Sequence, residues 1–141
     1  MPMLLVGADG GTHATSGVVP ELTRMLFDLT GAGEIDQAMK LQYRLLELFD
    51  AMLYSAEFPE GFRAAVELRG FAMGRGRQPL SASQQVNRER LQTVLRCLLA
   101  DSGYVEPPPE GCPPRRPDAD AVRVNEIAGE VVAALRQKGV L

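Results

Sequence analysis

Histidine, the commonest general base, and cysteine, a frequent zinc ligand, are scarce in this sequence. The 141 residues include one histidine, His13, and two cysteines, Cys97 and Cys112. A general base needs a hydrogen-bond partner in a cleft, and no partner stands at a fixed spacing from His13, so we expect it on the surface of a strand. The cysteines have neither disulfide-framework nor metal-ligand spacing. We therefore predict no metal site, no disulfide, and a buried apolar role for Cys97.

Arginines and tyrosines offer two further kinds of chemistry. Arg75 and Arg77 stand in a loop marked by glycine and proline, where guanidinium groups can clamp a carboxylate. Tyr43 and Tyr54 stand in a long helical pattern, where a catalytic tyrosine would need a perturbed proton affinity. Nothing in the spacing supplies a second group for either role. We favour a solvated loop for the arginines and packing or interface contacts for the tyrosines.

The glycine-rich residues 7–17 suggest either an anion-binding loop or a strand. Glycines let backbone amides approach a phosphate at a helix N-terminus, but the segment lacks both the Walker lysine spacing and the dinucleotide fingerprint. Small and β-branched residues after the apolar run 3–6 are typical of a strand with a tight loop. We predict a strand and loop over residues 1–19.

Composition narrows the classes of partner. A formal net charge of -3 without a basic stripe gives no surface for nucleic acid. No run approaches the roughly 18 to 20 apolar residues of a membrane-spanning helix. The opening residues lack the basic start and small-residue cleavage site of a secretory signal. We expect a cytoplasmic protein with no cofactor, no membrane contact and no nucleic-acid partner.

Helical spacing of apolar residues dominates the rest of the chain. The pattern predicts helices over residues 20–30, 34–55, 59–70 and 82–101, separated by glycines. Ser81 and Gln84 have the capping-box form at the start of the last of these helices. The predicted fold class is therefore mostly α, with one N-terminal strand and a helical region over residues 20–104.

A proline-rich linker over residues 105–118 precedes a predicted amphipathic helix over residues 119–141. Its apolar face is formed by Val124, Ile127, Val131 and Leu135. This arrangement resembles the encapsulation peptides that tether enzymes to bacterial microcompartment shells, which would place the protein in such a compartment. The helix either docks to a shell or scaffold protein or folds back onto its own chain or oligomer.

Four segments, in order, resemble the dihydrodipicolinate synthase and N-acetylneuraminate lyase family. Residues 7–15 (GADGGTHAT) followed by PEL at 20–22 look like its eighth barrel strand, and residues 34–53 resemble its long leucine-rich helix. Residues 58–68 (FPEGFRAAVEL) and 77–81 (RQPLS) resemble two later segments. The likeness covers residues 4–104. It implies the last strand and C-terminal helices of a (β/α)8 barrel.

The resemblance implies Schiff-base chemistry that this chain does not carry alone. Members join a lysine on the sixth strand to pyruvate or another 2-oxo acid, with a relay tyrosine on the fourth strand. Those strands are missing from this sequence. Lys40 and Lys138 are the two lysines, and neither follows a strand as a barrel nucleophile must. We expect a fragment without catalytic residues, with the missing barrel portion or another copy as partner and pyruvate or a 2-oxo acid bound in the complete enzyme.

In the family, the strand face that carries Thr12 and Ala14 points toward the substrate. Strand alternation would turn His13 and Thr15 the other way. The chain departs from the family at Thr12, usually isoleucine or valine, at His13, usually serine, and at Gly17, usually asparagine. We predict Thr12 and Ala14 as pocket-lining residues. The alternative function is a noncatalytic helical assembly module.

Overall fold

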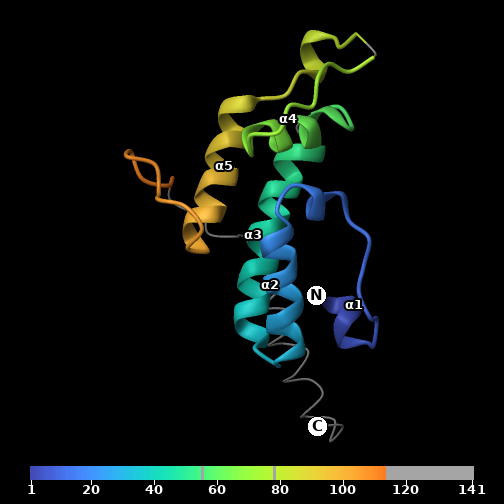
Figure 1. Ribbon diagram of the computed structural model, residues 1–141, viewed down its shortest axis with the longest axis vertical. Helices are drawn as coiled ribbons and strands as arrows, with labels where there is room; N and C mark the ends of the chain where they lie inside the picture. Colours follow the sequence, from blue (N-terminus) through green and yellow to red (C-terminus); the bar gives the residue numbers. More distant parts are fainter. Residues whose placement is uncertain (55, 78, 114–141) are drawn as a thin grey trace, which may run out of the picture. The chain divides into compact units, whose positions relative to one another are not determined.

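The computed structural model describes residues 1–54, 56–77 and 79–113. The chain divides into two compact units, Met1–Glu110 and Gly111–Leu141. The first unit contains helices α1 (Pro2–Leu5), α2 (Pro20–Gly31), α3 (Ile35–Leu53), α4 (Glu60–Leu68) and α5 (Arg88–Asp101) (Figure 1). Two 3-10 helices, η1 (Ala14–Gly17) and η2 (Ala82–Gln84), lie in the connections.

Helices α2 and α3 form a tight antiparallel hairpin. Pro20 occupies the first turn of α2, where its missing N–H costs no hydrogen bond. At the other end, Gly33 adopts φ +78°, and the Glu34 amide donates to the Leu29 carbonyl at 2.9 Å. This left-handed position is one that glycine adopts without steric cost, so the turn between the helices is encoded locally.

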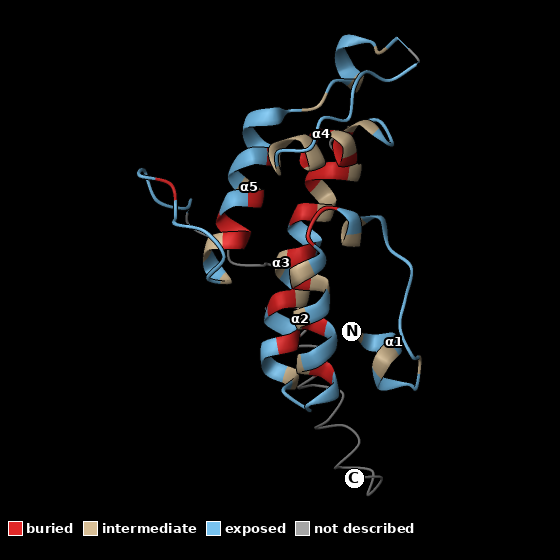
Figure 2. Ribbon diagram, viewed as in Figure 1, coloured by how far each residue is buried: buried red, intermediate tan, exposed pale blue. Residues whose placement is uncertain are grey.

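Helix α3 is the centre of the core. It contacts α2, α4 and α5, and its buried residues recur at helical spacing (Figure 2): Ala38, Leu41, Leu45, Leu48, Ala51 and Met52. Because these residues cover a wide arc of the helix, α3 can pack against several neighbouring helices at once. Leu22 and Leu26 of α2 and Leu91, Leu95 and Leu98 of α5 complete the same cluster.

The last predicted helix starts later than the sequence pattern indicates. The capping box of Ser81 and Gln84 is present, but it closes η2, and Gln85 then adopts an extended conformation (φ -72°, ψ 144°). Helix α5 begins at Arg88, where the Asn87 side chain accepts a hydrogen bond from the Arg90 amide at 3.0 Å. The prediction of a helix from residue 82 was wrong because a capping box stabilises one turn and does not fix the length of the helix that it begins.

The predicted N-terminal strand is also absent from the described part of the chain. Residues 2–5 form α1, begun by Pro2, and Gly7 ends it with φ +97°. A strand is stable only when its amide and carbonyl groups pair with a neighbouring strand, and the described residues supply no such neighbour. The mostly helical class and the helices near 20–30, 34–55 and 59–70 are confirmed.

The prediction that the cysteines form no disulfide was wrong as well. Cys97 is buried in α5, as expected, but both Cys97 and Cys112 are disulfide-bonded. The spacing of two cysteines in the sequence does not show how close their sulfur atoms lie in the fold. It therefore could not exclude a disulfide at these residues. The proposed docking residues Val124, Ile127, Val131 and Leu135 lie outside the described residues, and so does Lys138.

Candidate functional site

A cavity of about 820 Å³ opens beside the glycine-rich segment. Its walls come from α1, residues 9–16, α2 and α3. Most of the lining is apolar, with Leu26 and Phe27 from α2 and Leu45, Leu46 and Phe49 from α3. The hairpin of α2 and α3 therefore provides a rigid apolar floor, and the N-terminal segment forms the rim.

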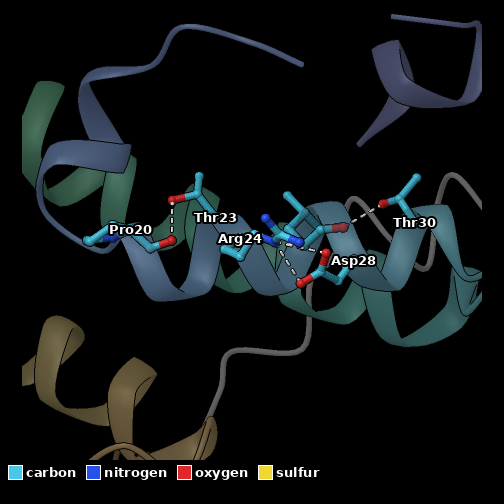
Figure 3. Close-up of polar contacts among 6 residues, drawn as sticks. Pro20, Thr23, Arg24, Asp28 and Thr30 are labelled. Carbon is cyan, nitrogen blue, oxygen red and sulfur yellow. Dashed lines mark hydrogen bonds and ion pairs between the residues drawn. The ribbon is translucent and has the colours of Figure 1, made fainter. Parts of the chain in front are cut away.

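One charged group in the cavity lining, the Arg24 guanidinium, is paired with a carboxylate of its own helix. The Arg24 Nε atom donates to both carboxylate oxygens of Asp28, each at 2.9 Å, along the exposed side of α2 (Figure 3). The hydrogen bond to Asp28 and the charge of that carboxylate raise the pKa of the Arg24 guanidinium above its usual value. The same guanidinium carbon lies 5.8 Å from the centre of the Phe27 ring. Arg24 thus stays charged but is engaged within α2, so it is poorly placed to hold a substrate carboxylate.

Two hydroxyl groups in the cavity wall are held by the backbone. Thr23 Oγ1 donates to the Val19 carbonyl at 2.8 Å and contacts the Pro20 carbonyl at 3.2 Å, as Figure 3 shows for Pro20. Ser16 Oγ donates to the His13 carbonyl. A nucleophilic hydroxyl instead needs a base that accepts its proton. These groups therefore stabilise local structure and are not activated for catalysis.

Thr12 and Ala14 line the cavity, but so do His13 and Thr15. The predicted alternation, with His13 and Thr15 on the opposite face, was wrong because the segment does not form a strand. Thr12, His13 and Ala14 are exposed to solvent at the open rim. Residues 7–17 begin no α-helix, so the anion-loop alternative also lacks the helix N-terminus that it requires.

The remaining candidates lie away from the cavity. Lys40 is exposed on α3 and does not line it. Tyr54 is 76% exposed and makes an edge-on contact with Phe49, with 6.0 Å between ring centres. Arg75 and Arg77 are exposed in their loop, as predicted. Within residues 1–54, 56–77 and 79–113, no cluster of histidine, cysteine and carboxylate side chains could hold a metal ion.

Sequence analysis missed the apolar part of the site. Neither Phe27 nor Leu46 was singled out from the sequence, yet the two residues are 42% and 50% exposed and both line the cavity. A signal for this surface is present in the sequence, because the apolar residues of α3 cover a wider arc of the helix than its buried residues do. Arg63 was also missed; it donates to the carbonyls of Met73 and Gly74, each at 2.8 Å, and holds the loop after α4.

No helix in the described part of the chain is long and apolar enough to cross a membrane.

Arg44 connects α3 to the end of α5 through Asp101 at 2.7 Å, and Arg90 of α5 contacts Asp50 of α3 at 2.6 Å. These ion pairs lie on the α3 and α5 side of the first unit, apart from the cavity lining.

Comparison with known proteins gives a consistent set of relatives. The sequence model of the dihydrodipicolinate synthetase family matches residues 1–98. The chain is 35% identical to the 4-hydroxy-tetrahydrodipicolinate synthase of Methanopyrus kandleri over 98 residues, which are 70% of this chain and 32% of the relative. It is 30% identical to the synthase of Caldicellulosiruptor bescii over 103 residues, 73% of this chain and 33% of that relative. The chain therefore spans about a third of the length of these relatives. No solved structure matches the chain significantly.

Proposed function

Since the chain belongs to the dihydrodipicolinate synthetase family, we propose that it is the C-terminal part of a (β/α)8 barrel lyase that acts on pyruvate or another 2-oxo acid through a Schiff base. The observation that carries this proposal is the family match over residues 1–98, which amounts to about a third of each relative. The lyase reaction would then require the other two thirds. In that complete enzyme, Thr12 and Ala14 would line the substrate pocket.

The side chains of the cavity agree with a supporting role. A Schiff-base nucleophile must be a lysine amine that attacks the 2-oxo carbon, after which the carbonyl oxygen leaves as water. Lys40, the lysine in the described part of the chain, is exposed and outside the cavity. The hydroxyls of Ser16 and Thr23 are bonded to backbone carbonyls. In this proposal the chain provides side chains that line the pocket and the helices that support them. The nucleophilic lysine would belong to the missing portion.

Reductive trapping tests the proposal in two steps. The chain alone, incubated with pyruvate and borohydride, should show no adduct on Lys40 or Lys138 above the rate of free lysine. A fusion that joins this chain to the part of the Methanopyrus kandleri synthase that it does not match should form an adduct on a lysine of that part. An adduct on Lys40 or Lys138, or a folded fusion that traps no pyruvate, would overturn the proposal.

The alternative function is noncatalytic assembly, with residues 119–141 as a docking helix for a shell or scaffold protein. Its support is the apolar spacing of Val124, Ile127, Val131 and Leu135 after a proline-rich segment. A bacterial microcompartment would be the setting. The sequence encoded upstream of Met1 distinguishes the two functions. A barrel sequence that continues there favours the lyase, and its absence favours the assembly module.

A further inference from the structure

Asp9 and Gly10 form the only aspartate–glycine pair of the sequence, and they lie in the connection between α1 and α2. Both residues are exposed and belong to no helix, and Figure 2 shows this connection in the colour of exposed chain. Within the described residues, the Gly10 amide makes no backbone hydrogen bond, and the Asp9 carboxylate makes no hydrogen bond or ion pair. The carboxylate and the neighbouring amide are therefore both available to react with each other.

The length of an aspartate side chain allows its carboxyl carbon to reach the nitrogen of the next residue. The closure forms a five-membered ring, and two groups held together in one chain react far faster than two separate molecules do. In most sequences the Cβ of the following residue crowds the attacking nitrogen and restricts the backbone. Gly10 has no Cβ, and nothing lies within 4 Å of the place where one would stand. Neither sterics nor hydrogen bonds oppose the closure at this position.

We propose that Asp9 is a modification site, at which the bond between Asp9 and Gly10 rearranges without an enzyme to an isoaspartyl bond. The Gly10 nitrogen attacks the carboxyl carbon of Asp9, and the new C–N bond forms while the carboxyl hydroxyl leaves as water together with the amide proton. A water molecule then opens the cyclic imide. Opening at the main-chain carbonyl of Asp9 leaves the chain running through Cβ and Cγ, with the former main-chain carboxylate as the side chain. The water released in the first step balances the water consumed in the second.

The rearrangement changes the wall of the cavity. Asp9 and Gly10 line this cavity together with Thr12 and His13. An isoaspartyl bond inserts one methylene group into the main chain and carries its charge on a shorter side chain. It therefore alters the spacing between α1 and the residues that follow Gly10. This inference does not depend on the proposed lyase function.

A second aspartate provides a control within the same chain. Asp101 precedes Ser102, whose small side chain also hinders ring closure little, but Asp101 is the last residue of α5. The Arg44 guanidinium binds its carboxylate at 2.7 Å. The ring can close only after this ion pair and the last turn of α5 have opened, so rearrangement at Asp101 should be slow in the folded chain.

The test follows isoaspartate in the purified full chain during weeks at neutral pH and physiological temperature. After reduction of the cysteines, trypsin releases residues 1–24 and 97–115, and each of these peptides contains a single aspartate and no asparagine. Chromatography separates the isoaspartyl form of each peptide, and electron-transfer fragmentation locates the altered bond. The isoaspartyl fraction at Asp9 should exceed that at Asp101 at least about tenfold, because only Asp101 requires a local opening of the fold.

Two variants test the role of Gly10. Gly10→Val should slow the rearrangement at Asp9 at least about tenfold, because a β-branched side chain crowds the attacking nitrogen. Gly17→Val is the matched control: it also adds a side chain in open space in the same connection, and it should leave the rate at Asp9 unchanged. Circular dichroism melting of both variants checks that they fold like the wild type.

Unfolding the wild-type chain in guanidinium chloride separates the effect of the fold from that of the sequence. The rate at Asp9 should stay nearly unchanged, since the described fold does not hold this segment, whereas the rate at Asp101 should rise. The proposal is overturned by an absence of isoaspartate at Asp9 in the folded chain, or by a rate at Asp9 that rises on unfolding as steeply as the rate at Asp101. A Gly10→Val chain that rearranges as fast as the wild type would also contradict it.

Discussion

Gly61 of α4 lies so close to the backbone of Met52 in α3 that an added Cβ would stand 1.9 Å from the Met52 carbonyl oxygen. Only a residue without a side chain permits the two helices to approach this far. Because the obstacle is backbone and not a flexible side chain, it cannot rotate away. The contact therefore fixes how α4 crosses the central helix.

Substitution Gly61→Ala should lower the stability of the first unit. Overpacking typically costs about 1 to 3 kcal/mol, which exceeds the gain of about 1 kcal/mol in helix propensity. The melting temperature should fall by several degrees, at roughly 4 to 8 °C per kcal/mol. Thermal melting followed by circular dichroism measures it. Gly31→Ala is the matched control: it sits in α2 with nothing within 4 Å of the new Cβ, and it should leave the melting temperature unchanged or slightly raised.

The second prediction compares two ion pairs of different burial. The Arg44 side chain is 14% exposed and joins α3 to Asp101, whereas Arg24 and Asp28 are 74% and 53% exposed on one helix. Asp101→Asn should destabilise the unit by about 1 to 2 kcal/mol, because it leaves a largely buried guanidinium with less compensation. Asp28→Asn should leave the free energy of unfolding nearly unchanged, because solvent screens this exposed pair. Urea unfolding curves give both values, and equal costs would show that burial does not govern these pairs.

The helices were predictable because their information is local. Ala38, Leu45 and Met52 repeat at helical spacing and are buried in α3, and Gly33 marks the turn before it by a conformation that glycine favours. Each of these signals depends on a few neighbouring residues. These local signals are therefore the same in the isolated chain and in a longer protein.

The cavity was less predictable because its features depend on distant partners. Thr12 and Ala14 were expected on one face of a strand, but a strand exists only when another pairs with it. Leu46 follows the helical spacing of apolar residues, but this spacing does not show whether another surface covers the side chain. Likewise, the positions of Cys97 and Cys112 in the sequence did not reveal that both are disulfide-bonded.

The third prediction concerns self-association of the chain in the absence of its proposed partner. The apolar floor around Phe27 and Leu46 would be exposed to water in a monomer, and burying it between copies is favourable. Sedimentation velocity should show species larger than the monomer at high micromolar concentration. The double variant Phe27→Glu/Leu46→Glu should shift the distribution toward monomer. A wild-type chain that remains monomeric and melts cooperatively would show that the first unit is stable without burying this apolar surface against another chain.

The last prediction concerns residues 119–141, which lie outside the described residues, so its basis is their sequence alone. If they dock to a partner, Ile127→Asp/Val131→Asp should abolish that docking while leaving the melting of the first unit unchanged, because a charge on the apolar face opposes its burial. The affinity should be modest, since four apolar side chains at roughly 1.5 to 3 kcal/mol each must offset helix ordering and the entropy of association.

The measurement is fluorescence microscopy of the labelled full chain in bacteria that express a microcompartment shell, paired with thermal melting of the purified variants. The wild type should co-localise with the shell and the double variant should be diffuse. Lys138→Ala, which leaves the apolar positions intact, is the control and should behave like the wild type. A marked fall in the melting temperature of the double variant would instead mean that the segment packs against its own fold, because a free docking helix makes no contribution to that transition.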